Sequence, residues 1–258
     1  MPLPHLVLIV GTESQGKAGL HSDLRAIGEL PVQVSSVITC VTAQPQDAAI
    51  SLLAVEQDLL EAQLAAALQL GPPQAVKIGL LGSSAALSLV EGLPDRLRRA
   101  GAAGCSLIID PVMRSSANSE RPLHTIARQA WLRALSAADL VTPNLDEASW
   151  LLDCAAEQVR ADPQRATQAL AQTLGCRVLL KGGHGTGSSS VDWLCDDTLC
   201  CAFERRRLAL RTRGTGCYLA SAIAARRALG QPWARACLEA GDQLHAALRR
   251  GQPPALSF

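Results

Sequence analysis

Residues 105–113 read CSLIIDPVM, an almost wholly apolar run that ends in a carboxylate. A run of this kind is typical of a central strand in a parallel sheet, because helices cover both faces of such a strand. Open α/β sheets place their ligand-binding groups at the carboxyl ends of their strands. We therefore predict that Asp110 lies at a ligand-binding edge of a parallel sheet.

Apolar strands alternate with helical segments on both sides of this run. Strands are predicted at 5–10, 37–41, 74–81, 105–109, 139–141 and 177–180, and helices at 19–30, 55–70, 83–101 with a break or bend near Pro94, 121–135, from 142–148 onward, 163–174, 215–229 and 233–249. Three short strands at 191–194, 199–203 and 206–210 are predicted to be antiparallel, because their connections are short. The alternation predicts a parallel sheet with helices on both faces. No repeat or linker divides the chain, so we expect one domain over residues 1–258.

The composition excludes several classes of function. With 258 residues the chain is long enough for one large α/β domain with a buried core. Aromatic residues make up only 3%, which argues against a base-stacking surface for nucleic acids. The net charge of +1 gives no attraction to polyanions or membranes, and no apolar stretch approaches the length of a membrane span. We expect a soluble, cytoplasmic protein.

The nine cysteines show neither a C-x-x-C pair nor the spacing of a zinc site. This pattern is typical of a reduced cytosolic protein with buried thiols. Lysine is rare, because Lys17, Lys77 and Lys181 are the only three in the chain. Each of these lysines is therefore worth locating in the fold.

A second informative stretch, RTRGTGC, covers residues 211–217 and leads into an alanine-rich segment. Its glycines allow a sharp turn, after which Thr215 or Gly216 is expected to cap a helix. The first amide groups of a helix have no partner within it, and the helix dipole adds positive charge there. With Arg211 and Arg213 beside it, this helix end is predicted to bind an anion such as a phosphoryl group.

Cys217 falls in the first turn of the same helix. A thiol in that position typically has a lowered pKa, so it is a candidate base or nucleophile. The alternative is a plain loop-to-helix turn in which the cysteine is a small buried apolar residue. The local sequence leaves both interpretations open.

Two further segments lie at predicted strand ends. Gly11 to Lys17 matches the spelling G-x-x-x-x-G-K of a phosphate-binding P-loop, but Ala18 follows where that motif needs a serine or threonine to ligate magnesium. A P-loop is therefore a rival hypothesis. Gln44 follows the strand at 37–41 and can offer both a donor and an acceptor to a ligand.

Taken together, these strand-end motifs resemble those of the ribokinase-like small-molecule kinases, and most closely the hydroxymethylpyrimidine and phosphomethylpyrimidine kinases of thiamine synthesis. The resemblance covers nearly the whole chain. It is carried, in order, by Gly11-Thr12 with Ala18-Gly19 and Asp23, Ser36-Val-Ile-Thr39 with Ala43-Gln44, Lys77-Ile-Gly79, Asp110-Pro-Val-Met113, Thr142-Pro-Asn-Leu145 with Glu147-Ala148, Lys181-Gly-Gly-His184, Asp192-Trp-Leu194 and Gly214-Thr-Gly-Cys217.

This resemblance implies a three-layer α/β/α kinase that transfers the γ-phosphoryl group of ATP to a hydroxymethyl group on a small heteroaromatic ring, and in the thiamine enzymes also to the monophosphate. Family members are generally homodimers. The residues that the resemblance assigns to the pyrimidine pocket are Gly11, Asp23, Gln44, Leu80 and Val112, with Asp23 and Gln44 facing the amino and nitrogen edge of the ring.

The phosphoryl end is assigned in the same way. The resemblance implies that Asp110 and Glu147 hold Mg²⁺, directly or through water, and that Asn144 and Lys181 contact the phosphates of ATP. The backbone amides of Gly214, Thr215, Gly216 and Cys217 would form the anion hole, and the Cys217 side chain would accept the hydroxyl proton.

The chain also departs from the family pattern. The first loop usually reads GTDPSGGAG and here reads GTESQGKAG, so the segment from Glu13 to Lys17 differs beside the substrate pocket. The other departures are Thr42, Leu80, Ala117-Asn118, Arg213 and Tyr218, which replace a valine, a methionine, Ser-Gly, a histidine and a threonine. They leave three alternatives open: altered ring specificity, as in a pyridoxal-type kinase; an enzyme that carries out a single phosphorylation; and a catalytically weak paralogue that binds a pyrimidine.

Overall fold

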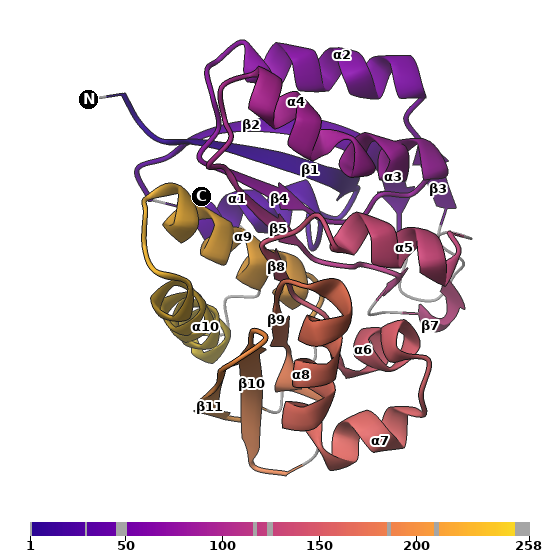
Figure 1. Ribbon diagram of the computed structural model, residues 1–258, viewed down its shortest axis with the longest axis vertical. Coiled ribbons are helices and arrows are strands. Elements are labelled where there is room, and N and C mark those ends of the chain that lie inside the picture. Colours follow the sequence, from indigo (N-terminus) through magenta and orange to yellow (C-terminus); the bar gives the residue numbers. More distant parts are fainter. Residues whose placement is uncertain are drawn as a thin grey trace.

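A mostly parallel sheet forms the centre of the computed structural model, which describes residues 2–28, 30–44, 51–115, 118–122, 126–184, 187–208 and 212–250 (Figure 1). Across these residues the sheet has nine strands in the order β11-β10-β9-β8-β5-β4-β1-β2-β3. The strands are β1 (His5–Glu13), β2 (Gln33–Ala43), β3 (Ser51–Ala54), β4 (Ala75–Ile78), β5 (Ser106–Ile109), β8 (Leu140–Val141), β9 (Arg177–Leu180), β10 (Ser189–Cys195) and β11 (Cys200–Arg206). The six central strands, β9, β8, β5, β4, β1 and β2, pair in parallel. The outer strands β3, β10 and β11 each pair antiparallel with their inner neighbour.

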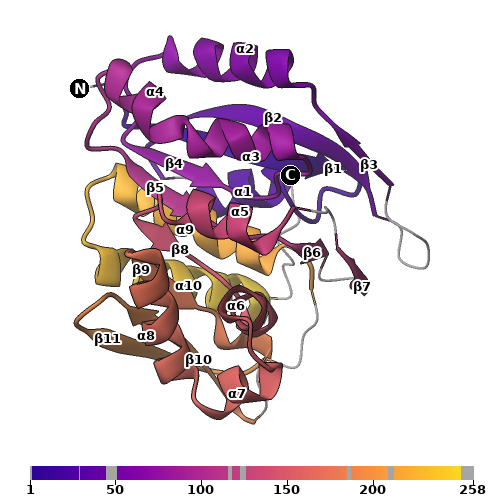
Figure 2. The same ribbon diagram turned by 45° about the vertical axis from the view of Figure 1, so that its right-hand side comes forward.

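Helices cover both faces of this sheet (Figure 2). One layer holds α2 (Gln57–Leu68), α3 (Ser84–Glu91), α4 (Leu93–Arg99), α5 (Arg128–Leu135), α6 (Leu145–Leu152), α7 (Ala156–Ala161) and α8 (Pro163–Leu174), and the other holds α1 (Leu20–Ile27), α9 (Thr215–Ala228) and α10 (Trp233–Arg249). The structure therefore confirms the three-layer α/β/α, ribokinase-like architecture that the resemblance implied.

Strand β1 shows how the sequence produces these layers. Leu6 and Leu8 point into the core under α9, whereas Val7 and Ile9 point into the core under α2 and α3, because successive side chains of a strand face opposite sides. All four side chains are fully buried. The continuous apolar run, rather than an alternating one, is what a strand covered on both faces requires.

Local end signals explain why several predicted helix bounds agree with the structure. The Asp162 carboxylate caps α8 by accepting a hydrogen bond from the Arg165 N–H, and Pro163 occupies the first helical position. Gly175 ends the helix in the left-handed conformation, with φ +67°. The predicted bounds of α8 and α10 match the structure at both ends.

The prediction of a helix at 121–135 is wrong over its first part. Residues 118–122 form β7, which pairs with β6 (Arg114–Ser115) in a small second sheet, and α5 begins only at Arg128. Pro122 accounts for the non-helical backbone of Arg121, because a proline disfavours helical backbone in the residue before it. Asn118 belongs to β7, and Ala117 lies outside the described residues.

Other differences lie in the antiparallel segments. Strand β3 and helix α7 were not predicted, and of the expected strand at 206–210 only Arg206 lies in a strand, at the end of β11. Residues 207 and 208 have no regular structure, whereas residues 209 and 210 lie outside the described part, as does Arg211. The Gly-Ser tract is shorter than expected, since β10 begins at Ser189.

The expectation that all cysteines are reduced is also contradicted. Cys195 and Cys200 face each other at the end of the β10–β11 hairpin and form a disulfide. Sequence spacing gave no signal for it, because the pairing depends on the hairpin register. Separately, none of the described helices is both long enough and apolar enough to cross a membrane.

Candidate active site

Three polar residues meet where β5, β8 and β9 end. Asp110, Thr142 and Lys181 each directly follow one of these adjacent parallel strands. The Lys181 ammonium lies 2.7 Å from Asp110 Oδ1, and the Thr142 hydroxyl donates to the same oxygen at 3.2 Å. Asp110 and Thr142 are buried. The expected ligand-binding edge of the sheet is therefore built around a buried carboxylate with its cation.

Glu147 joins this group from the start of α6. Asn144 caps the helix by accepting hydrogen bonds from the N–H groups of Asp146 and Glu147, and the Glu147 carboxylate accepts from the Asn144 N–H at 2.7 Å. This capping box fixes the Glu147 side chain. Its Oε2 lies 3.9 Å from the Lys181 ammonium.

The backbone turn after Lys181 is also held in place. The Gly182 N–H donates to Asp192 Oδ1 at 2.9 Å, and a Cβ at Gly182 would lie 2.0 Å from the Val191 carbonyl oxygen. Only glycine fits so close to another backbone. The motif around Lys181 therefore needs its first glycine for packing against β10.

The charges at this edge influence each other strongly. Burial raises the pKa of Glu147 to about 7, although Lys181 opposes the rise. Burial lowers the pKa of Lys181, but the carboxylates of Asp110 and Glu147 outweigh burial and the net direction is upward. The lysine is therefore held as a cation facing two carboxyl groups.

The amino end of α9 lies against the same charges. Gly214 caps this helix in the left-handed conformation, with φ +79°, so the expectation of a cap at Thr215 or Gly216 is wrong. Thr215 is instead the first residue of the helix. A Cβ on Gly216 would lie 3.0 Å from the Lys181 ammonium and 3.4 Å from Asp110 Oδ2. The helix backbone thus closely approaches both groups.

Cys217 follows Gly216 in the first turn of α9. The expectation of a lowered pKa is contradicted. Burial raises the pKa of the thiol to about 11, and Asp23 and Asp110 add to the rise while Lys77 opposes it. The helix end alone would favour a thiolate, but loss of water around the sulfur has the larger effect.

The loop from Glu13 to Lys17 is organised by its own carboxylate. Buried Glu13 accepts hydrogen bonds from the backbone N–H groups of Gln15 at 2.9 Å, Ala18 at 3.1 Å and also Lys17. These are the amides that a P-loop would direct at a phosphate, and here the carboxylate occupies them. The Lys17 side chain is exposed. The structure therefore argues against the P-loop hypothesis.

Replacing Glu13 with glutamine tests this role of the carboxylate. An amide oxygen is a weaker acceptor than a carboxylate, so we expect a loss of about 1–3 kcal/mol in the free energy of unfolding, measured by urea denaturation. The exposed neighbour Gln15→Glu is the matched control and should stay within about 0.5 kcal/mol. Equal stability of both variants would contradict the organising role of Glu13.

The residues expected to bind a ring lie around β1. A Cβ on Gly11 would be 2.8 Å from the Cys40 sulfur and 3.2 Å from Leu80, so Gly11 and Leu80 are neighbours. The Gln44 carbonyl accepts a hydrogen bond from Arg213 at 2.8 Å, which ties this segment to the residue before Gly214. Val112 follows Asp110, and its N–H donates to the Asp110 carbonyl.

Asp23 has a setting that the sequence did not indicate. Its carboxylate is fully buried on α1 and pairs with the equally buried ammonium of Lys77 at 2.9 Å. The Ser221 hydroxyl donates to the same carboxylate oxygen, also at 2.9 Å. Lys77 stood out in the sequence as one of three lysines and as part of the Lys77-Ile-Gly79 motif, but neither signal gave it a role, and no signal pointed to Ser221.

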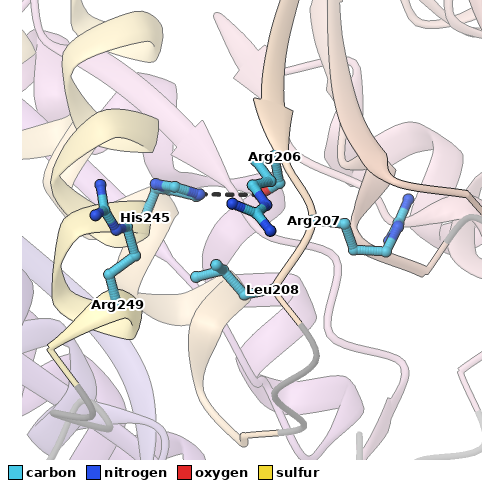
Figure 3. A pocket seen from close by; sticks show the side chains of 5 residues that line it. All are labelled: Arg206, Arg207, Leu208, His245 and Arg249. Atoms are coloured by element: carbon cyan, nitrogen blue, oxygen red, sulfur yellow. Dashed lines mark hydrogen bonds between the residues drawn. The ribbon is translucent and has the colours of Figure 1, made fainter.

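A separate cavity of about 400 Å³ lies between β11 and α10 (Figure 3). It is lined by Arg206, Arg207, Leu208, His245 and Arg249. His245 contacts the Arg206 carbonyl oxygen at 2.9 Å. Arg207 donates to the carbonyl groups of Gly182 and Gly183, so it connects the cavity wall to the turn η1 (Gly182–His184) that follows Lys181.

No group of three His, Cys, Asp or Glu side chains gathers as a metal site within the ranges that the structure describes. Mg²⁺ needs less than that, because it is usually held by one or two carboxylates together with water and substrate phosphates. Asp110 and Glu147 flank one ammonium from two sides, and Asp110 Oδ2 lies on the side of Gly216. This donor set fits the ion.

Comparisons with known proteins agree with this geometry. The family model described as phosphomethylpyrimidine kinase matches residues 13–255. The hydroxymethylpyrimidine/phosphomethylpyrimidine kinases of Escherichia coli and Salmonella typhimurium are 35% and 33% identical, each over 93% of this chain and 89% of their own length.

Solved structures show the same fold. A pyridoxal kinase from Staphylococcus aureus in complex with ADP superposes with a TM-score of 0.83 at 25% identity, over 95% of this chain and 88% of that one. A phosphomethylpyrimidine kinase from Clostridium difficile gives 0.74 at 26% identity, over 95% of this chain and all of that one. With a family model that covers almost all of its length, this chain belongs to the phosphomethylpyrimidine kinase family.

Proposed function

We propose that this kinase transfers the γ-phosphoryl group of ATP to the hydroxymethyl group of 4-amino-5-hydroxymethyl-2-methylpyrimidine, and then to the resulting monophosphate, in thiamine biosynthesis. The observation that carries the proposal is the Lys181–Asp110 pair directly beneath the glycine-capped amino end of α9. Relatives named for both phosphorylation steps support the same substrates.

Phosphoryl transfer depends mainly on positioning and on neutralising charge at the transferred group. In this proposal the amides of Gly214, Thr215 and Gly216 face the γ-phosphoryl oxygens, and Lys181 supplies a fixed positive charge beside them. Asn144 forms an isolated parallel bridge with Lys181, and in this proposal it would contact the phosphates of ATP. Asp110 and Glu147 would hold Mg²⁺, which would neutralise phosphate charge when bound.

The ring would lie on the β1 side of the same helix end. Gly11, Leu80, Gln44 and Val112 would form the walls of the pocket. Asp23 would accept a hydrogen bond from the amino group of the ring, because its Oδ2 is buried and has no hydrogen-bond partner among the described residues.

Cys217 is proposed to accept the hydroxyl proton in its thiolate form, and its substitution tests that role. Because burial raises the pKa of the thiol to about 11, only a small fraction is thiolate near neutral pH, so kcat is expected to rise as the pH is raised toward that value. We expect Cys217→Ala to lower kcat about 10²- to 10⁴-fold with little change in the KM for the pyrimidine, since general bases contribute about this much. Steady-state kinetics with varied pyrimidine measure both constants. Cys217→Ser keeps a polar group of similar size, so its kcat should lie between those of the wild type and Cys217→Ala. An unchanged kcat in the alanine variant would leave Cys217 as a packing residue.

The function itself is tested with the purified protein, ATP, Mg²⁺ and the pyrimidine alcohol, by following phosphorylated product with ³¹P NMR. No product at high enzyme concentration would exclude this substrate. Pyridoxal is the main competitor, because structural relatives are named as pyridoxal kinases. A competition assay with both alcohols shows whether the protein is a pyrimidine kinase or a pyridoxal kinase. Binding of the pyrimidine without turnover would instead favour the catalytically weak paralogue.

Three further expectations stay predictions: a homodimer, magnesium dependence and a cytoplasmic location. Sedimentation velocity tests the first. Titration of activity with Mg²⁺ after treatment with a chelator tests the second. Fractionation of cells that express the tagged protein tests the third.

A further inference from the structure

The ion pair between Lys77 and Asp23 joins three elements beside the proposed reaction centre. Lys77 lies on β4, Asp23 on α1, and Ser221 on α9, four residues after Cys217. Both charged side chains are fully buried. A Cβ on Gly79 would lie 2.8 Å from the Lys77 ammonium, so the absence of a side chain there leaves room for the cation.

The two oxygens of the Asp23 carboxylate are used very unequally. Oδ1 accepts hydrogen bonds from both Lys77 and Ser221, each at 2.9 Å. Oδ2 is buried and has no hydrogen-bond partner among the described residues. A buried carboxylate oxygen without a donor is costly, typically by about 1–3 kcal/mol or more. This arrangement points to a donor that arrives with a ligand.

The surroundings of Asp23 show which ligand can supply that donor. The Asp23 N–H donates to the Gly19 carbonyl at 3.0 Å, while burial and, to a lesser extent, the charge of Asp23 raise the pKa of the Cys217 thiol. A Cβ on Gly19 would lie 2.2 Å from the Gly11 carbonyl oxygen, so these backbones are in close contact. Asp23 is therefore near the Cys217 thiol and is hydrogen-bonded to a backbone that packs against Gly11, where the proposed ring pocket begins.

The protonation state of Asp23 decides which hydrogen bond it can make. An ionised carboxylate only accepts hydrogen bonds, whereas a protonated one can also donate. Burial is the largest influence on Asp23 and the net direction of its pKa is upward, although Lys77 opposes that rise through its charge and its hydrogen bond. Asp110 adds to the rise, and Ser221 opposes it. Burial lowers the pKa of Lys77, but its net direction is also upward, with Asp23 the largest cause of the rise, so the ammonium 2.9 Å away remains a cation that favours the ionised carboxylate. Removing the cation would therefore favour the protonated acid.

We propose that Lys77 is a specificity-determining residue: its charge keeps Asp23 an acceptor only, so the site selects a ring that presents an amino N–H over one that presents an oxygen at the same edge. This inference rests on the proposed function for the identity of the ring. Lys77 acts through Asp23 and is a positioning residue. Ser221 shares the same oxygen but carries no charge.

The test compares two acceptors that differ at one position, the 4-amino pyrimidine alcohol and its 4-oxo analogue. The ratio of their kcat/KM values is measured for the wild-type protein, Lys77→Met and Ser221→Ala. We expect the wild type to prefer the amino ring and Lys77→Met to reduce the preference about 10- to 100-fold, as for loss of a hydrogen bond to a charged group. Ser221→Ala should keep the wild-type ratio within about threefold, even if both rates fall.

An equal loss of kcat/KM for both acceptors in Lys77→Met would show that Lys77 has a merely structural role, and it would overturn the proposal. An unselective wild type would also overturn it. If Lys77→Met does not fold, the double variant Asp23→Asn/Lys77→Met removes both buried charges and keeps the shapes. Its amide can donate as well as accept, so we expect it to lose the preference too, and a preserved preference would contradict the proposal.

Calorimetric binding of both ring alcohols separates this inference from the proposed kinase activity. A protein that binds the amino ring more tightly than the oxo ring, but forms no phosphorylated product, would contradict the activity and support the role of Lys77, provided that Lys77→Met loses the preference. A protein that phosphorylates both rings equally well would support the kinase and overturn the selectivity.

Discussion

Replacing Lys181 with methionine is expected to lower kcat about 10²- to 10³-fold, the usual effect of removing a positioned group that stabilises transition-state charge. Methionine has a similar length but no charge. It leaves Asp110 and Glu147 facing each other without the ammonium that lies 2.7 Å from one carboxylate and 3.9 Å from the other. Single-turnover kinetics with saturating ATP measure the chemical step directly.

The matched control is Lys17→Ala, because Lys17 is the lysine of the P-loop-like spelling and its side chain is exposed. We expect this variant to bind ATP as the wild type does, measured by calorimetry. Loss of nucleotide binding in Lys17→Ala, together with normal turnover in Lys181→Met, would reverse the assignment of the phosphate site. Thermal denaturation of Lys181→Met shows whether its defect comes from unfolding.

A single methyl group on Gly214 is expected to have the second large effect. A Cβ there would lie 2.1 Å from the Lys17 carbonyl oxygen and 3.0 Å from the Ser22 hydroxyl, and the φ of +79° adds strain for any other residue. The loop from Glu13 to Lys17 must then move away from the end of α9. We expect Gly214→Ala to lower kcat/KM about 10²-fold, since small misplacements of reacting groups have effects of this size.

The control variant Gly230→Ala separates the effect of the steric clash at Gly214 from the effect of backbone strain at a positive φ. Gly230 follows the other end of α9 with a nearly equal φ of +81°, but a Cβ there would meet nothing within 4 Å. We expect this control to lose only about 1–2 kcal/mol of stability and no activity. Chemical denaturation and steady-state assays of both variants measure the difference. Similar activity in the two variants would mean that close packing on Gly214 is not needed for catalysis.

The sequence was sufficient for the fold wherever a local cause determines the structure. The apolar run 105–109 predicted a strand buried on both faces, and β5 is that strand. Asp162, Pro163 and Gly175 fixed both ends of α8 through bonds made within a few residues. The helix predicted at 121–135 was wrong at its start, because residues 118–122 form β7 and pair with β6.

The candidate site was predicted unevenly, for the same reason. Asp110 was predicted from its place after an apolar strand, whereas Asn144, Glu147 and Lys181 were assigned by the resemblance of their motifs to the family, and the structure brings all four together. The capping box of Asn144 and Glu147 is itself a local signal. Their roles toward ATP and Mg²⁺ stay predictions.

The sequence by itself determined the alternation of the central parallel strands with their covering helices, the glycine positions that allow close backbone contacts, and the family to which the chain belongs. Only the tertiary structure decided the charge states. It pairs Lys77 with Asp23, 54 residues away in the sequence. It lets the backbone amides that follow Glu13 donate to the Glu13 carboxylate. It also buries Cys217, so that the pKa of the thiol rises instead of falling. Propensity and capping act between near neighbours, whereas desolvation and charge pairing depend on which distant segments exclude water from the same place.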